Sequence, residues 1–190
     1  MKITKDFDGL VKREFRYEIS GDLISKGGIE IDLDMWLFVS GRIEAGWGIK
    51  AGEGIKAGES IKAGWGIEAG EGIEAGWGIE AGSGIKAGWG IEAGWGIKAG
   101  SGIKAGWGIK AGSGIKAGSG IKAGSGIEAG LSIRCKLKII FKYAIFAGIC
   151  TWRETNPEDE VIECAALVGG SLKCGKFKKI ESAKKSKVSK

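Results

Sequence analysis

The chain has 190 residues, among them 37 Gly, 8 Trp, one Pro and no His, and its formal net charge is +6 at pH 7. So much Gly with a single Pro excludes a collagen, which needs Gly at every third residue and abundant Pro. It also argues against a helical protein, because each Gly in a helix interior costs about 1 kcal/mol. The 43% of hydrophobic residues argues against a disordered chain.

Residues 1–42 are predicted to form an N-terminal cap and the strand that leads into a repeat. Residues 29–39 at first alternate apolar and acidic side chains, as a half-buried strand does. Ile31 and Leu37 are in phase with Ile43, so we expect the strand register to begin before the repeat. Residues 1–28 then cover the first open edge. The charged N-terminus does not resemble a signal peptide, so we expect a cytoplasmic protein with reduced thiols.

Residues 43–132 consist of 15 units of six residues. Every unit has Ile first, Lys or Glu second, Ala third and Gly fourth. The fifth residue is Trp, Ser or Glu, apart from Leu131 in the last unit. The sixth is Gly, apart from Ser60 and Ser132. The region carries 9 Lys and 9 Glu, so its net charge is zero.

This period predicts a short strand and a bend in each unit. Because six is a multiple of two, the same face of the strand stays in phase, with Ile and Ala pointing inward and Lys or Glu outward. The Gly pair suits a corner, because Gly adopts positive φ without steric cost. Strands of three residues cannot bury Ile alone, so coils must stack about 4.8 Å apart. Three units per coil give a triangular β-solenoid of about 18 residues per coil and about five coils over the repeat.

The charges of the second positions favour three units per coil. At a separation of three units, 8 of 13 pairs are opposite in sign, against 6 of 14 at a separation of two units. Side chains of opposite charge that lie next to each other on adjacent coils, which we call rung neighbours, stabilise the fold by about 0.2–1 kcal/mol per pair. The first five of these pairs are all opposite: Glu44/Lys62, Lys50/Glu68, Lys56/Glu74, Lys62/Glu80 and Glu68/Lys86.

After the repeat, residues 133–172 are predicted to form a C-terminal β cap and residues 173–190 a basic, disordered tail. Ile133 and Ile139 keep the phase of the repeat, and two apolar runs flank a turn at 155–160. The apolar run at 139–150 is too short to cross a membrane. The four Cys have no C-x-x-C spacing and there is no His, so we expect buried thiols and no metal site.

The Ile-led period of six resembles the hexapeptide repeats of left-handed parallel β-helix proteins. The IKAGWGIEAG units, the AGLSIRCK exit and the later FAGICTW resemble more specifically an uncharacterised family of bacterial hexapeptide-repeat proteins. This resemblance covers about residues 43–152 and implies a left-handed parallel β-helix with capped ends. The family is associated with gut bacteria and mobile elements, and it supplies no assigned active residues.

Enzyme function is disfavoured, because there is no His base and no predicted pocket. Ice binding is disfavoured, because charged residues occupy every outward strand position of the repeat. We therefore expect a non-enzymatic rigid scaffold, without cofactor, metal or small-molecule substrate, that binds a protein partner or self-associates. The alternatives are nucleic-acid binding through basic ladders and the tail, or, given the mobile-element resemblance, inhibition of a nucleic-acid-targeting defence complex of the CRISPR type.

Two kinds of side chain are candidate binding residues. Exposed Trp residues are typical anchors of interfaces, and a ladder of cations repeated every ~4.8 Å could follow phosphates. The simpler interpretation is a solvated, charge-balanced face with Trp covering Gly corners. The candidate residues are Trp47, Trp65, Trp77, Trp89, Trp95, Trp107, Lys86, Lys98, Lys104, Lys116, Lys122 and Arg134.

Overall fold

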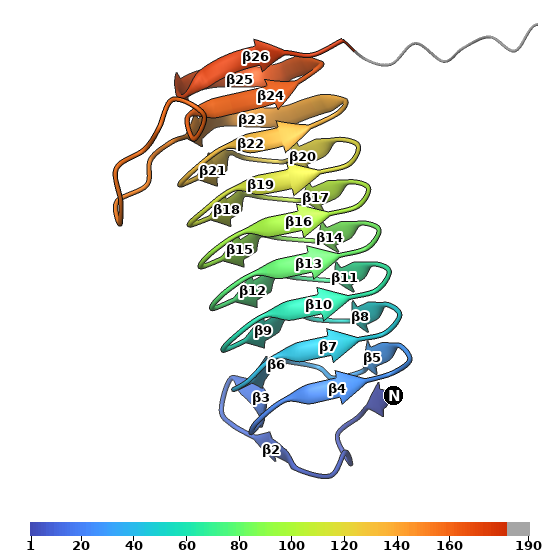
Figure 1. The fold of residues 1–190 in the computed structure, drawn as a ribbon. Coiled ribbons are helices and arrows are strands. Elements are labelled where there is room, and N and C mark those ends of the chain that lie inside the picture. Colours follow the sequence, from blue (N-terminus) through green and yellow to red (C-terminus); the bar gives the residue numbers. More distant parts are fainter. Residues whose placement is uncertain (182–190) are drawn as a thin grey trace, which may run out of the picture.

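The computed structural model describes residues 1–181 and shows a rod of stacked triangular coils, with no helix among these residues (Figure 1). The chain winds from the N-terminal end of the rod to the C-terminal end, one coil above the other. Most of the predicted basic tail, residues 182–190, lies outside the described residues.

The strands line up on three faces of the rod, which we call the first, second and third face. The first face contains β1 (Lys2–Ile3), β5 (Ile29–Ile31), β8 (Ile49–Ala51), β11 (Ile67–Ala69), β14 (Ile85–Ala87), β17 (Ile103–Ala105) and β20 (Ile121–Ala123). The second contains β2 (Leu10–Lys12), β3 (Arg16–Ile19), β6 (Trp36–Val39), β9 (Ile55–Ala57), β12 (Ile73–Ala75), β15 (Ile91–Ala93), β18 (Ile109–Ala111) and β21 (Ile127–Ala129). The third contains β4 (Leu23–Ser25), β7 (Ile43–Ala45), β10 (Ile61–Ala63), β13 (Ile79–Ala81), β16 (Ile97–Ala99), β19 (Ile115–Ala117), β22 (Ile133–Cys135), β24 (Val161–Cys164) and β26 (Lys176–Lys179).

Each repeat unit forms the strand and the bend that its pattern predicts. Ile and Ala are buried in every unit, with Ile at most 2% exposed, whereas the second residue lies outside the core. The strands pair in parallel with the same position three units away, as in Ile61 with Ile79 and Lys62 with Glu80. The predicted triangular solenoid with three units per coil is therefore confirmed, while its left-handed winding stays a prediction.

The core is a column of aliphatic side chains that runs the length of the rod. One continuous cluster joins the caps to the repeat, from Ile3 to Cys164. Because three residues per strand bury only one Ile and one Ala, the stability of each coil depends on the coils above and below it. The third face stacks nine strands into one sheet, which gives about nine coils in all.

The Gly residues of the repeat serve a different purpose from the one predicted. None of them has positive φ, so the expectation that Gly adopts positive φ at the corners is wrong. A Cβ at the fourth position, for instance at Gly82, would lie 3.0 Å from the carbonyl carbon of Gly64 and closer still to its oxygen. At the sixth position, a Cβ at Gly84 would lie 3.3 Å from the oxygen of Gly102, a tight contact but not an overlap. In the middle of the repeat, close approach of stacked backbones therefore requires the fourth Gly and not the sixth, whereas nearer its C-terminal end a Cβ at Gly120 or Gly126 would lie 2.9 or 2.8 Å from a backbone oxygen.

The N-terminal coils are longer than those of the repeat. Ile29 pairs with Ile49 and Ile31 with Ala51, so this coil has two residues more than a coil of three units. The predicted phase is therefore correct for Leu37, which pairs with Ile55, and wrong for Ile31, because the longer coil puts Ile29 in the first position. Strand β2 pairs with β3 in an antiparallel manner at the end of the stack.

The C-terminal coils continue the parallel stack. Ile133 and Ile139 pair with Ile115 and Ile121, which confirms their predicted phase. The long strand β23 (Lys138–Ala147) pairs with both β20 and β21, so it joins the first and second faces into one sheet of 17 strands. Strand β25 (Ala166–Cys174) pairs in parallel with β23, and β24 pairs in parallel with β22 and β26. The two apolar runs beside the 155–160 turn thus each extend the stack in parallel.

Candidate functional site

Each face of the rod carries a shallow groove that runs along the axis. Its lining is the sixth, first and second residues of successive units, and aromatic or aliphatic side chains at the fifth position also border the grooves on the first and second faces. The groove on the first face has a volume of about 1180 Å³, and those on the second and third faces have about 570 and 550 Å³. The side chains in the walls therefore decide what each face can bind.

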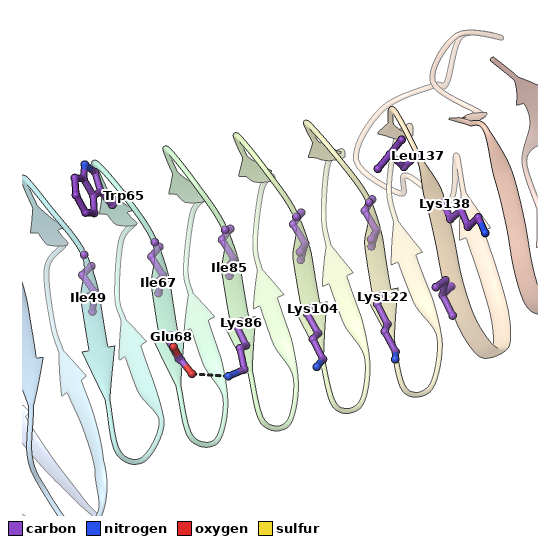
Figure 2. Close-up of a pocket in the computed structure, with 18 of the residues that line it drawn as sticks. Ile49, Trp65, Ile67, Glu68, Ile85, Lys86, Lys104, Lys122, Leu137 and Lys138 are labelled. Atoms are coloured by element: carbon purple, nitrogen blue, oxygen red, sulfur yellow. Dashed lines mark hydrogen bonds and ion pairs between the residues drawn. The ribbon is translucent and has the colours of Figure 1, made fainter. Parts of the chain in front are cut away.

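A row of lysines borders the first-face groove. Lys86, Lys104 and Lys122 are rung neighbours on β14, β17 and β20 and point the same way (Figure 2). The Lys86 ammonium donates to Glu68 at 2.6 Å, and this contact lowers the pKa of the Glu68 carboxyl. Within residues 1–181, Lys104 and Lys122 form no ion pair. The positive charge of this row is therefore neutralised by a carboxylate only at its N-terminal end, where Glu68 contacts Lys86.

A second row of cations follows the third face. Lys98, Lys116 and Arg134 are rung neighbours on β16, β19 and β22. The Lys98 ammonium donates to Glu80 at 2.7 Å and lowers the pKa of that carboxyl. A carboxylate lies at the N-terminal end of this row, as on the first face, and Glu163 on β24 is the neighbour of Arg134 at its C-terminal end.

The two basic rows flank the same corner, where the third face turns into the first. Between them lie only the small side chains of Ser101 and Ser119, followed by Leu137. The unit that contains Leu137 also has Lys in place of both of its Gly residues, and both lysines are exposed. We call this surface the basic corner: Lys98, Lys104, Lys116, Lys122, Arg134, Lys136 and Lys138. Lys136 and Lys138 are not among the residues expected from the sequence, although the IRCKLK unit signals them.

The six Trp residues of the repeat all point away from the core. Their exposed fractions run from 51% to 70%, and they are divided equally among the three corners. All three pairs are joined by a backbone hydrogen bond between neighbouring coils, and two of them also stack their rings with centroids 6.2 Å apart. The pairs are Trp47 and Trp65 on the third–first corner, Trp89 and Trp107 on the first–second corner, and Trp77 and Trp95 on the second–third corner.

An aromatic side chain outside the repeat occupies one of the grooves. The indole of Trp36 lies over Gly54 and Gly72 on the second face, where a Cβ on either Gly would collide with the ring. The indole N–H donates to the carboxylate of Glu71. Trp36 thus covers two Gly residues, whereas the covering of Gly corners by the Trp residues of the repeat stays a prediction. No pattern in the repeat predicts this contact, because Trp36 precedes it.

Two of the four cysteines have buried thiols that are poor nucleophiles. All four are free; Cys135 and Cys164 are buried, and Cys150 and Cys174 are half-buried. Burial raises the pKa of Cys135 to about 11 and also raises the pKa of Cys164. A thiol with so high a pKa carries little thiolate at neutral pH and is a poor nucleophile.

In residues 1–181, no group of three or more Cys, Asp or Glu side chains is placed to hold a metal ion. The same residues contain no helix that is long and apolar enough to cross a membrane. No known protein family, curated protein or solved structure matches the chain. The structure supports the general resemblance to hexapeptide-repeat β-helix proteins, whereas membership of the uncharacterised bacterial family stays a prediction.

Proposed function

We propose that the protein is a non-enzymatic scaffold that binds a protein partner, or a copy of itself, through side chains on the corners of the rod. The observation that carries this proposal is the set of six exposed Trp side chains on a rigid backbone. Large apolar groups at such exposure are typical of interface anchors, because their burial in a partner contributes much of the binding energy. The three grooves repeat the same few residue types, which suits recognition of an extended surface more than catalysis.

The repeat itself supplies variants that test this proposal. Native units have Ser as well as Trp at the fifth position, so Trp→Ser is compatible with the fold. We expect Trp47→Ser with Trp65→Ser, or Trp89→Ser with Trp107→Ser, to weaken binding of a purified partner at least tenfold. The partner is first captured from a lysate of the source cell and then bound again in pure form. Unchanged binding by every Trp→Ser variant would contradict the proposal.

A second candidate function is the binding of nucleic acid or of a nucleoprotein, including the defence complexes that the resemblance suggests. The basic corner supports it, because five of its residues repeat at coil spacing and three of these, Lys104, Lys116 and Lys122, form no ion pair within residues 1–181. The test is binding of DNA and RNA oligonucleotides over a range of salt concentrations, with Lys104→Glu and Lys122→Glu combined as the variant. Binding that weakens with salt and is lost in the variant supports this function. The absence of binding at low salt removes it.

A further inference from the structure

Of the three grooves, the one on the first face is the largest and carries the most positive charge. Its charged lining residues are five lysines and one glutamate, a net charge of +4: Lys50, Glu68, Lys86, Lys104, Lys122 and Lys138. The second-face groove has one lysine and three glutamates, a net charge of −2, and the Trp36 ring lies over its glycines. The third-face groove is basic as well, but it has less than half the volume and no fifth residue in its lining.

The two long sides of the first-face groove differ in chemistry. Lys86, Lys104 and Lys122 follow one side, and Trp65 and Leu137 lie on the other (Figure 2). Trp65 is 67% exposed and Leu137 is 50% exposed. These two residues lie four coils apart, about 19 Å, and each of the three coils between them has Ser at the same position. The groove thus offers a row of cations along one side and an apolar contact at each end of the other.

From this arrangement we propose that the first-face groove binds an acidic, amphipathic α-helix of a partner protein, which lies along the axis of the rod. The proposal rests on the scaffold function and specifies which kind of segment the partner presents. The groove requires an acidic segment, because its one carboxylate, Glu68, is already neutralised by Lys86 at 2.6 Å. The carboxylates of the helix contact Lys104 and Lys122, and its apolar side chains pack between Trp65 and Leu137, as in other helix-in-groove complexes.

The spacing of the lysines favours a helix over an extended segment. Neighbouring lysines of the row are one coil apart, so Lys86 and Lys122 are separated by about 9.6 Å. Two turns of an α-helix advance about 10.8 Å, so the side chains on one helix face stay close to the row. In an extended segment, side chains on one side recur every ~6.7 Å, and two such steps exceed the lysine spacing by about 4 Å. A helix of about 13 residues reaches from Trp65 to Leu137.

A library of phage-displayed segments tests the kind of ligand. Segments of about 18 residues are selected on the immobilised full chain, because isolated helices shorter than about 12–15 residues are marginal in water. We expect enrichment of sequences in which Asp and Glu recur every three or four residues beside an apolar face. A synthetic peptide of an enriched sequence should gain helical circular dichroism on binding. Enrichment of sequences without this pattern, or no enrichment at all, would overturn the proposal.

Two lysines in equivalent places provide a matched pair of variants. Lys104 lies between two lysines of the first-face row, and Lys116 lies between Lys98 and Arg134 on the third face. By fluorescence anisotropy, Lys104→Glu should weaken binding of the enriched peptide by about tenfold, because it puts a carboxylate opposite the carboxylates of the helix. Lys116→Glu should weaken it by no more than about twofold, because its charge lies on another face. Equal losses would indicate a nonspecific attraction to the whole basic corner and would overturn the proposal.

The apolar contacts are tested with the same peptide. Trp65→Ser and Leu137→Ser should each weaken its binding by about threefold or more, whereas Trp77→Ser, on the second–third corner, should not. Unchanged binding by both of the first two variants would contradict the predicted position of the helix. A partner captured for the scaffold that depends on Trp89 and Trp107 but not on Lys104 would overturn the groove proposal and leave the scaffold function intact.

Discussion

A single methyl group on Gly82 should disrupt the stack, whereas the same group on Gly84 should be tolerated. Both residues lie in the same unit, one at the fourth and one at the sixth position. The Cβ of Gly82→Ala would overlap the carbonyl oxygen of Gly64 on the preceding coil and would lie 3.0 Å from the carbonyl carbon. The Cβ of Gly84→Ala would lie 3.3 Å from the nearest oxygen, that of Gly102.

The size of the effect follows from the bonds that must open to admit the Gly82 methyl group. The N–H of Gly82 donates to Ala63 at 3.0 Å, and the N–H of Ser83 donates to Trp65 at 2.8 Å. Separating the coils weakens both bonds and leaves polar groups without partners, at about 1–2 kcal/mol each, so we expect a loss of about 3 kcal/mol. Gly84→Ala should change the stability by no more than about 0.5 kcal/mol, because reduced freedom of the unfolded chain offsets a tight contact.

Guanidinium unfolding followed by far-ultraviolet circular dichroism measures both variants. The midpoint of Gly82→Ala should fall clearly below that of the native chain, and the midpoint of Gly84→Ala should stay close to it. Ser60 and Ser132 are natural examples of a side chain at the sixth position. Equal midpoints for the two variants would refute the argument that backbone approach dictates the fourth Gly.

Burial and charge support three further predictions. Ile79→Ala should lower the free energy of unfolding by about 3 kcal/mol in guanidinium titration, because Ile79 is 1% exposed and leaves a cavity. Lys98 lowers the pKa of Glu80 in the folded state, so this pair stabilises the fold above the ordinary carboxyl pKa of 4.5 and ceases to do so as the pH falls through the lowered value. In Glu80→Gln, the melting temperature should therefore fall less steeply with decreasing pH on the acid side, and an unchanged pH dependence would contradict the pairing. Native alkylation at pH 8, read by mass spectrometry, should modify Cys150 and spare Cys135, whose pKa burial raises to about 11; rapid modification of Cys135 would show that its coil opens.

The fold could be predicted from the sequence because one period satisfies several physical requirements together. Ile and Ala on alternate positions define an inner face, and the opposite charges three units apart anticipate the rung pairs, such as Lys56 with Glu74 at 2.9 Å. The role of Gly could not be predicted with the same means. Period and composition show that the residue must be small, but only the stacked backbones show that space, not φ, is the reason.

The candidate site could be predicted less completely. The basic rows are predictable because strand register follows from the period. The contact of the Trp36 ring with Gly72 is not, because it depends on the path of a longer coil before the repeat. The sequence also shows a segregation of charge along the rod, with a net charge of −5 in residues 1–95 and +7 in residues 96–181, which the neutral sum over the repeat conceals.

The correspondence of one coil to three units governs how the protein can change length. Loss or gain of three units removes or adds one coil and leaves every later residue on its original face. Loss of a single unit instead turns all later residues by a third of a revolution, so Ser and Lys from the third–first corner move to a neighbouring edge. Duplications in the gene are therefore tolerated by the core in steps of one unit, but they preserve the pattern of the outer surface only in steps of three.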